Sequence, residues 1–390
     1  MWFDMGSRVL EESWVAEGDI MIKSKKLLRL LAVLAALALF ASACGSGGDE
    51  SASASSCGTD EVDGDLALFN WAEYIDEEQL AEFADTFGIN ATMTTYDSNE
   101  AMQSIIAGGN SGYDVIVPSD YMVSILIDGG DVMELNKDAI PNAKNVSDEF
   151  SGLYYDPTAT YSLPYQWGTT GIGVNTAVVG TDFPRSWAII FDPSFADEFS
   201  GSISLLNDPR ETMGAALKYL GFSLNSTSEA ELAEATMLIS ETKDRLAAFN
   251  TDSADEFLTD GNTVIGHGFS GDMFTQFLGT DNPEDYVYFV PEEGGTRWID
   301  NMAVPVDAPH PCTAHTFINW MLDGDQGAAL SNWNYYSTPN EAAKPGLDQE
   351  LLDFVNDPSV VAGGPDSLEL IEDTGDFEPN YSDAFIEARG

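Results

Sequence analysis

Three strand–loop–helix units follow one another in residues 66–129, and this series constrains the fold more than any other feature of the chain. Apolar or β-branched runs of strand length occur at 66–69, 91–96 and 113–117. After the first run, Asp76 and Gln79 form the pattern of a capping box that opens a helix. Because strands that alternate with helices build parallel sheets, we expect a mostly parallel, doubly wound α/β sheet.

Polar and aromatic side chains follow each of these three strands. Trp71, Glu73 and Tyr74 come after the first, Ser98 after the second, and residues 119–121 after the third. The carboxyl ends of parallel strands share one edge of the sheet, where α/β proteins place their ligand cleft. The flat faces of Trp and Tyr attract cations. We expect a binding site at this edge, although an aromatic residue at a strand end can also belong to the core.

The first residues have the pattern of an exported lipoprotein. Basic residues between 23 and 29 precede an apolar run at 30–40, and Ala41-Ser42-Ala43-Cys44 follows. This order is typical of a secretory signal, and a Cys directly after small residues resembles a lipoprotein box. We predict a signal segment at 1–43, a lipid on Cys44 and a flexible tether at 44–62, which is rich in Gly, Ser and Ala. Translation is expected to start at Met21, because the acidic residues before it do not suit a signal.

The middle of the chain repeats the strand–loop–helix pattern. A long extended stretch at 161–175 is predicted to cross into a second lobe, and 298–305 to cross back. Between them, Asp208 and Glu211 follow a strand and open a helix. Their spacing suits a capping box, which alone would explain both residues. A carboxylate at this loop could also face the cleft.

The charge composition of the chain limits which molecules it can bind. The chain has 66 acidic and 15 basic residues, which gives a net charge of −51. Nucleic acid is excluded as a partner because phosphate contacts need a basic face. The charge suits solubility in salty water and would also attract a cationic ligand. If Cys44 carries a lipid, Cys57 and Cys312 remain and could pair in an oxidising compartment.

Motifs of common catalytic and metal sites are missing from the sequence. It contains no P-loop, no H-E-x-x-H and no G-x-S-x-G. His310, Cys312 and His315 lack a fourth ligand for a metal. We predict no catalytic residue, no metal site and no cofactor.

Several motifs together resemble one protein family. In chain order they are Asn70-Trp71-Ala72-Glu73-Tyr74, Thr95-Tyr96-Asp97-Ser98-Asn99-Glu100, Tyr113-Asp114-Val115, Val117-Pro118-Ser119, Pro164-Tyr165-x-Trp167-Gly168, Trp298-Ile299-Asp300 and Ala303-Val304-Pro305. The chain strongly resembles the spermidine/putrescine-binding proteins of bacterial ABC importers over most of residues 65–345.

The resemblance implies an α/β, two-lobed, periplasmic-binding-protein-like fold with a ligand cleft between lobes joined by two crossing strands. Lobe 1 is expected at 63–167 plus 302–345, and lobe 2 at 168–301 plus 346–390.

The resemblance also implies a set of ligand-binding residues, carried over position by position. They combine an aromatic box, a hydroxyl and acids for the ammonium groups: Trp71, Glu73, Tyr74, Ser119, Tyr121, Asp208, Glu211, Phe269, Asp272, Trp298, Asp300 and Tyr336. Phe269 stands where many members have Trp. Asp208, Glu211 and Asp300 match the spermidine-binding type, whereas Asp272 matches the putrescine-binding type, so the preferred polyamine stays open. Glu378 is a further candidate for a polar contact.

The implied function is capture of a polyamine for uptake. We expect a monomeric, lipid-anchored protein outside the cytoplasmic membrane that delivers its ligand to an ABC permease and its ATPase. Other possibilities are a binding subunit for iron, an anion or another solute, a polyamine sensor for a membrane receptor, and a secreted hydrolase that uses two carboxylates.

Overall fold

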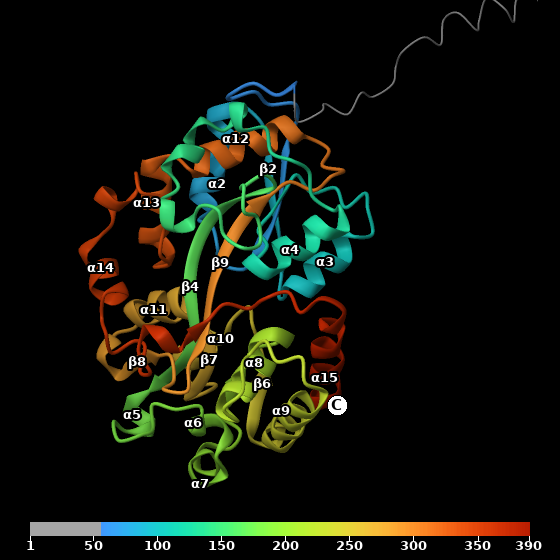
Figure 1. Cartoon of the computed structure of the whole chain (residues 1–390). Coiled ribbons are helices and arrows are strands. Elements are labelled where there is room, and N and C mark those ends of the chain that lie inside the picture. The colour runs from blue at the N-terminus through green and yellow to red at the C-terminus, as the bar shows by residue number, and fades with distance from the viewer. Residues whose placement is uncertain (1–55) are drawn as a thin grey trace, which may run out of the picture. The chain divides into compact units, whose positions relative to one another are not determined.

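The computed structural model describes residues 56–390 (Figure 1). The predicted signal segment at 1–43, the start at Met21 and the lipidation site Cys44 lie outside the described residues. The strands are β1 (Leu66–Trp71), β2 (Ala91–Tyr96), β3 (Val115–Ile116), β4 (Ser162–Asn175), β5 (Ile203–Leu205), β6 (Leu246–Phe249), β7 (Ile265–Phe269), β8 (Tyr286–Phe289), β9 (Gly295–Ala303) and β10 (Leu368–Glu369).

Helices cover the strands. They are α2 (Glu77–Phe87), α3 (Asn99–Ile106), α4 (Asp120–Gly129), α5 (Thr176–Val179), α6 (Ala188–Phe191), α7 (Pro193–Ala196), α8 (Pro209–Tyr219), α9 (Glu229–Thr242), α10 (Ala254–Thr259), α11 (Ser270–Gly279), α12 (Pro311–Met321), α13 (Gly324–Asn334), α14 (Gln349–Val355) and α15 (Pro379–Arg389). None of the helices in residues 56–390 combines the length and the apolar composition that a bilayer crossing requires.

The sheet has two parallel halves that two long strands join. Its order is β2-β1-β3-β9-β4-β7-β5-β6, with β10 beside β9 and β8 beside β4. In the first half β1 pairs in parallel with β2 and β3, and in the second half β5 pairs in parallel with β6 and β7. The strands β4 and β9 pair antiparallel and run side by side from one half into the other (Figure 1). Both crossing strands were predicted, and the structure confirms them.

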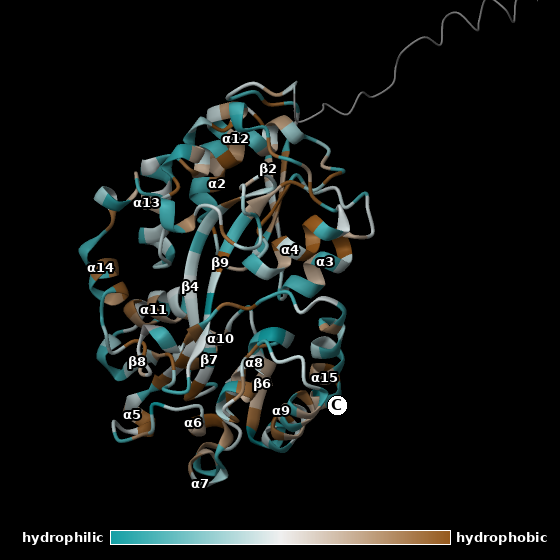
Figure 2. Cartoon of the chain, viewed as in Figure 1, coloured by the Kyte–Doolittle hydropathy of each residue, from teal (hydrophilic) through white to brown (hydrophobic). Residues whose placement is uncertain are grey.

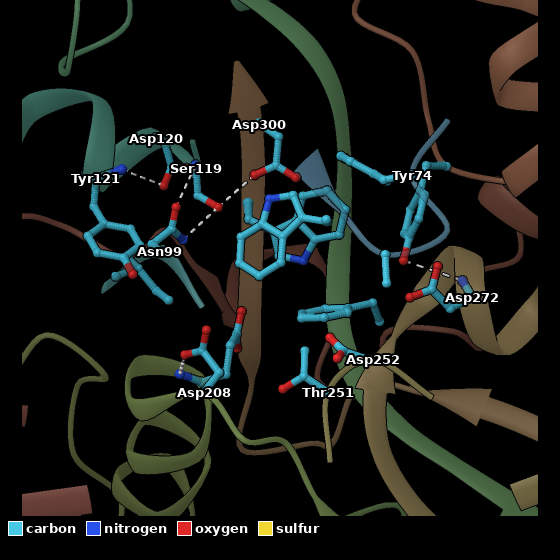
Figure 3. Close-up of a pocket in the computed structure, with 17 residues that line it drawn as sticks. Tyr74, Asn99, Ser119, Asp120, Tyr121, Asp208, Thr251, Asp252, Asp272 and Asp300 are labelled. Atoms are coloured by element: carbon cyan, nitrogen blue, oxygen red, sulfur yellow. Dashed lines mark hydrogen bonds between the residues drawn. The ribbon is translucent and has the colours of Figure 1, made fainter. Parts of the chain in front are cut away.

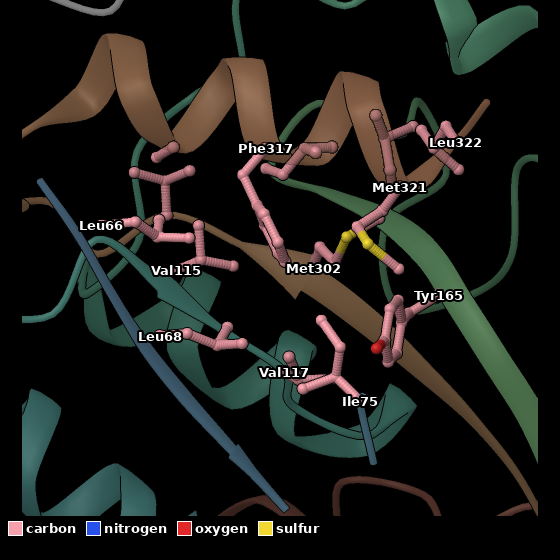
Figure 4. Close-up of a cluster of buried hydrophobic side chains, with 14 of the residues drawn as sticks. Leu66, Leu68, Ile75, Val115, Val117, Tyr165, Met302, Phe317, Met321 and Leu322 are labelled. Atoms are coloured by element: carbon pink, nitrogen blue, oxygen red, sulfur yellow. The ribbon is translucent and has the colours of Figure 1, made fainter. Parts of the chain in front are cut away.

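The first half is built on alternating burial of β1 and its neighbours. Leu66 and Leu68 are buried with Val115 and Val117, and Phe317 of α12 covers them (Figure 4). On the opposite face of the sheet, Phe69 packs in a separate cluster with α3 and α4. Burial on both faces makes β1 a nearly continuous apolar run, as the parallel arrangement requires.

The helix α2 shows how local sequence sets an element and where the prediction failed. Asp76 caps its start by accepting a 2.9 Å hydrogen bond from the backbone N–H of Glu78, and Gly88 ends it with a φ of 69°. The predicted capping box is wrong in its second half. Gln79 donates to Gln326 of α13 instead of reaching back to Asp76, because the buried amide finds a partner across the helix pair.

The second half has its own core. Ile172, Ile203 and Ile265 on neighbouring strands pack with Met213 of α8 and Phe385 of α15. Figure 2 shows hydrophobic colours on β6 and β7, whereas α13 at the surface is mainly hydrophilic. The C-terminal helix α15 therefore belongs to the body of this half.

The folded part begins earlier than the sequence suggested. Cys57 lies within the predicted tether, yet it is buried and forms a disulfide with Cys312 at the start of α12. Asn136 donates to the carbonyl of Cys57, and Thr316 donates to the carbonyl of Glu61. The prediction of a flexible segment up to Val62 is wrong for its last residues, because these contacts fix them on α12.

Candidate ligand-binding site

A pocket of about 660 Å³ lies where β1, β3, β7 and the crossing strand β9 present their loops and ends. The N-terminal ends of α4, α8 and α11 also reach it. The residues that line it are Trp71, Ala72, Tyr74, Asn99, Ser119, Asp120, Tyr121, Asp208, Glu211, Thr251, Asp252, Phe269, Asp272, Trp298, Asp300, Tyr336 and Ile371 (Figure 3).

Five aromatic side chains form one connected wall. Trp71 and Trp298 lie 6.3 and 6.0 Å from Phe269, and Tyr336 lies 5.2 Å from both Trp298 and Tyr74, measured between ring centroids. All four pairs meet edge to face, an arrangement that leaves ring faces free for a third group. The wall therefore offers apolar surface and cation-attracting faces to a slender ligand.

Asp300 joins the crossing strand β9 to the first half. Ser119 donates a 2.6 Å hydrogen bond to its carboxylate, and Asn99 donates to Ser119 at 3.1 Å. Burial raises the pKa of Asp300 to about 7, against the opposing effect of the hydrogen bond from Ser119. The carboxylate is held in place, and within residues 56–390 no Lys, Arg or His lines the pocket beside it.

Glu211 is held by both crossing strands. Thr170 of β4 donates to one carboxylate oxygen at 2.9 Å, and Thr296 of β9 donates to the other at 2.7 Å. Burial raises the pKa of Glu211 to about 7, which these two hydrogen bonds partly oppose. Since its side chain does not reach back to the helix start, the capping-box explanation of Glu211 is wrong.

Asp208 has a structural role as well as a place in the pocket. It caps α8 by accepting a 3.0 Å hydrogen bond from the backbone N–H of Glu211. Burial raises its pKa well above the ordinary value, and the charges of Glu100 and Glu211 add to this. The sequence left capping and cleft-facing roles open, and the structure shows that one side chain does both.

Asp272 stands at the start of α11 beside Tyr336. Its backbone N–H donates to the Tyr336 hydroxyl at 3.3 Å. Burial, followed by the charge of Asp255, raises the pKa of its carboxyl well above the ordinary value. In the view of Figure 3, Asp208 and Asp272 lie on opposite sides of the ring cluster and Asp300 lies above it.

The charged side chains that line the pocket are all acidic. Among the described residues it contains six acids and no Lys, Arg or His; the acids are Asp120, Asp208, Glu211, Asp252, Asp272 and Asp300. A buried carboxylate without a counter-charge is costly, which is why burial is the first cause of every raised pKa here. A bound cation would remove this cost, whereas an anion would increase it.

Eleven of the twelve residues predicted for the site line this one pocket. The exception is Glu73, which is exposed as a whole and has a φ of 51°. Partial shielding of its carboxylate, and then the charges of Asp255 and Glu256, raise its pKa to about 7. Glu73 therefore faces acids of the second half without entering the lining. Glu378 is also elsewhere, in an ion pair with Arg210 at 2.6 Å.

Sequence reasoning missed five lining residues, which are Ala72, Asn99, Thr251, Asp252 and Ile371. Ala72 and Asn99 lie inside the motifs that carry the resemblance, so their neighbours gave a usable signal. Asp120 was expected at this edge within residues 119–121, although the ligand-binding set left it out. Thr251 and Asp252 follow β6, a strand that the sequence did not reveal, and Ile371 lies in the C-terminal segment.

Two side chains of the His-Cys-His fragment have partners other than a metal. Cys312 is in the disulfide, and His315 accepts a hydrogen bond from the backbone N–H of Asn136 at 2.9 Å. Within residues 56–390 no three His, Cys, Asp or Glu side chains are grouped as metal ligands would be.

Comparison with known proteins gives consistent matches. Residues 78–358 match the family described as bacterial extracellular solute-binding protein. The chain is 37% identical over 294 residues to the putrescine/cadaverine-binding protein of Pseudomonas aeruginosa, covering 73% of this chain and 82% of that protein. It is 34% identical over 288 residues to the spermidine/putrescine-binding periplasmic protein of Escherichia coli, covering 73% and 80%. A solved structure from Listeria monocytogenes, described as a putative spermidine/putrescine ABC transporter, matches with a TM-score of 0.77 and 31% identity, covering 84% of this chain and 99% of that one.

The chain therefore belongs to the bacterial extracellular solute-binding protein family. The predicted two-lobed α/β fold and the role of a binding protein rather than a hydrolase are confirmed by these matches. Its place outside the cytoplasm follows from the same family.

Proposed function

We propose that this protein captures a polyamine, spermidine or putrescine, and delivers it to an ABC importer. One observation carries the proposal: in the described part of the chain, six acids and six aromatic residues line a single pocket without a basic side chain. A polyamine is a methylene chain with ammonium groups at intervals. Rings suit the methylenes, and carboxylates supply charge-assisted hydrogen bonds to the ammonium groups.

In this proposal each group of lining residues has a separate task. Trp71, Phe269 and Trp298 stack along the methylene chain, while Tyr74, Tyr121 and Tyr336 close the walls. Asp208 and Glu211 bind one ammonium end, and Asp272 binds the other. Asp300, oriented by Ser119, binds a charged nitrogen of the ligand between these two ends. Glu73 contributes negative charge at the mouth.

The lobes are proposed at 63–167 plus 302–345 and at 168–301 plus 346–390. Ligand capture is a closing motion of these lobes about β4 and β9. Support comes from contacts across the cleft, such as the 2.7 Å hydrogen bond from Asn207 to Asp97.

Calorimetry with spermidine and putrescine tests the ligand. The controls are 1,4-butanediol, which keeps the chain length without charge, and glutarate, which reverses the charge. We expect heat and a raised Tm with the amines alone. If neither spermidine nor putrescine produces binding heat or raises the Tm, the proposal is contradicted.

The membrane anchor and the transporter partners complete the proposed function. The Ala41-Ser42-Ala43-Cys44 pattern supports a lipid on Cys44. The Cys44→Ser variant should leave the membrane fraction while it keeps its ligand affinity, and mass spectrometry of the mature N-terminus should show the acyl chains in the wild type. A permease with its ATPase should hydrolyse ATP faster when the loaded protein is added.

A further inference from the structure

Arg210 is a buried cation directly behind the pocket. It is the second residue of α8, between Asp208 and Glu211, and only 1% of its side chain is exposed. One terminal nitrogen donates to both carboxylate oxygens of Glu378, at 2.6 and 2.7 Å. The other donates to Asn225 at 2.9 Å. Its guanidinium is therefore fixed in orientation.

Two aromatic rings lie against this guanidinium, one from each half of the molecule. Its central carbon is 4.3 Å from the ring centroid of Tyr381 in α15 and 5.2 Å from that of Tyr121 in α4. Tyr121 lines the pocket and donates a 2.8 Å hydrogen bond to Glu100 of α3. Arg210 thus reaches across the cleft, although it does not line the pocket.

Glu378 ties this contact to the C-terminal segment. It stands at the start of α15, and Thr374 donates to its carboxylate through both its backbone N–H at 3.2 Å and its hydroxyl at 2.7 Å. The same segment touches the first half elsewhere, since Tyr154 donates to the carbonyl of Ile371 at 2.8 Å. The C-terminal segment therefore packs on both sides of the cleft.

We propose that Arg210 is a positioning residue that stabilises the closed cleft. Aligned by Glu378, it holds the ring of Tyr121 in the opposite half; these three residues are called the latch. The inference rests on the proposed function, in which the two halves close on a polyamine. It gives the C-terminal segment a role in ligand retention.

The latch stabilises the closed state because the contact between Arg210 and Tyr121 exists only when the cleft is closed. When the halves separate, the 5.2 Å approach between Arg210 and Tyr121 is lost, whereas the ion pair of Arg210 with Glu378 stays within the second half. A contact made only after closure slows opening and leaves the encounter rate unchanged. The planar guanidinium both stacks on a ring and pairs with a carboxylate, and Lys cannot reproduce that geometry.

Stopped-flow tryptophan fluorescence with spermidine tests the latch, because Trp71 and Trp298 report on the pocket. The variants are Glu378→Gln and Arg210→Lys. The matched control is Glu369→Gln, which breaks the 2.6 Å ion pair with Lys218 in the same half and leaves Arg210, Glu378 and Tyr121 unchanged. We expect the dissociation rate to rise about five- to tenfold in both latch variants and the association rate to stay within about twofold. The control should retain both rates.

Small-angle scattering gives a second measurement. At saturating spermidine, the latch variants should show a larger radius of gyration than the wild type and the Glu369→Gln control. If Arg210→Lys fails to fold, Glu378→Gln decides. Dissociation rates equal to that of the control, or equal changes in both rate constants, overturn the latch. A wild-type protein that binds no polyamine overturns the proposed function and the latch with it.

Discussion

The hydroxyl of Ser119 donates a 2.6 Å hydrogen bond to the carboxylate of Asp300. Ser119 precedes α4 in the first half, and Asp300 lies on the crossing strand β9. The bond therefore fixes an acid of the hinge region to one wall of the cleft. An acid so placed needs no reorientation when a cation arrives, which favours tight binding.

The Ser119→Ala variant should bind spermidine more weakly. A hydrogen bond to a charged group contributes about 1.5–3 kcal/mol, so we expect about a ten- to hundredfold loss of affinity. Calorimetry measures it. The control is Ser104→Ala, since Ser104 is exposed and its hydroxyl donates to the carbonyl of Glu100 in its own helix. Equal affinity in the Ser119 variant and the wild type contradicts a role for this bond.

Ligand affinity should fall as the solution becomes more acidic. Glu211 and Asp300 have pKa values of about 7, first because they are buried. A polyamine binds their charged forms, so protons must leave when it binds at or below pH 7. We expect the affinity to fall about five- to fiftyfold from pH 8 to pH 6. Calorimetry in two buffers of different ionisation enthalpy should also detect proton release near pH 7. A constant affinity with no proton release rules out a link between ligand binding and the ionisation of Glu211 and Asp300.

The stability of the ligand-free protein should change with pH in the direction opposite to that of the ligand affinity. The ordinary pKa of Glu211 is 4.5, and in the folded pocket it is about 7. Between these values the folded chain binds more protons than the unfolded chain, so the free energy of unfolding falls as pH rises. For Glu211 alone the loss is up to about 3 kcal/mol. Urea unfolding at pH 5 and pH 8 measures it.

The matched variant for this measurement is Glu211→Gln, which has no proton to exchange. Its free energy of unfolding should change less between the two pH values than that of the wild type. Because both proteins share almost the whole surface charge, the difference between them isolates the pocket. The same pH dependence in both proteins excludes Glu211 as its source.

The sequence was sufficient to predict site residues where the local strand pattern and the side-chain chemistry point to the same place. β1 ends at Trp71 and Tyr74 follows in the next loop, because a buried parallel strand places its next residues at the ligand edge. The same rule placed Ser119 and Tyr121 at this edge, where the structure has them in the pocket lining. Physical pattern alone did not assign the remaining aromatic residues and acids of the pocket, which entered through the resemblance: Phe269, Asp272, Trp298, Asp300 and Tyr336.

Other parts of the site could not be predicted because they depend on tertiary contacts. The segment between Gly221 and Thr263 gave no clear pattern, yet it forms α9, β6 and α10. Thr251 and Asp252 reach the pocket only because β6 pairs beside β5. Likewise, Thr170 and Thr296 hold Glu211 because β4 and β9 pass side by side, and no spacing in the chain reveals that relation.

The position of Asp272 predicts how the site distinguishes polyamines. Asp208 and Glu211 belong to the start of α8, whereas Asp272 belongs to the start of α11, across the ring cluster in Figure 3. A triamine is long enough to place charges near both groups, while a short diamine leaves one group without a partner. Although the resemblance matches Asp272 to the putrescine-binding type, this geometry predicts that Asp272→Asn weakens spermidine binding more than putrescine binding.

Removing one partner of a buried charge pair costs about 2–3 kcal/mol, which corresponds to about a thirty- to hundredfold loss for spermidine. Competition calorimetry with both amines measures the ratio of affinities, and Asp281→Asn serves as the control because Asp281 is exposed in the loop after α11. An equal loss for both amines places the diamine at Asp272 as well. A larger loss for putrescine reverses the assignment, since it means that the diamine depends on the α11 end of the pocket and the triamine does not.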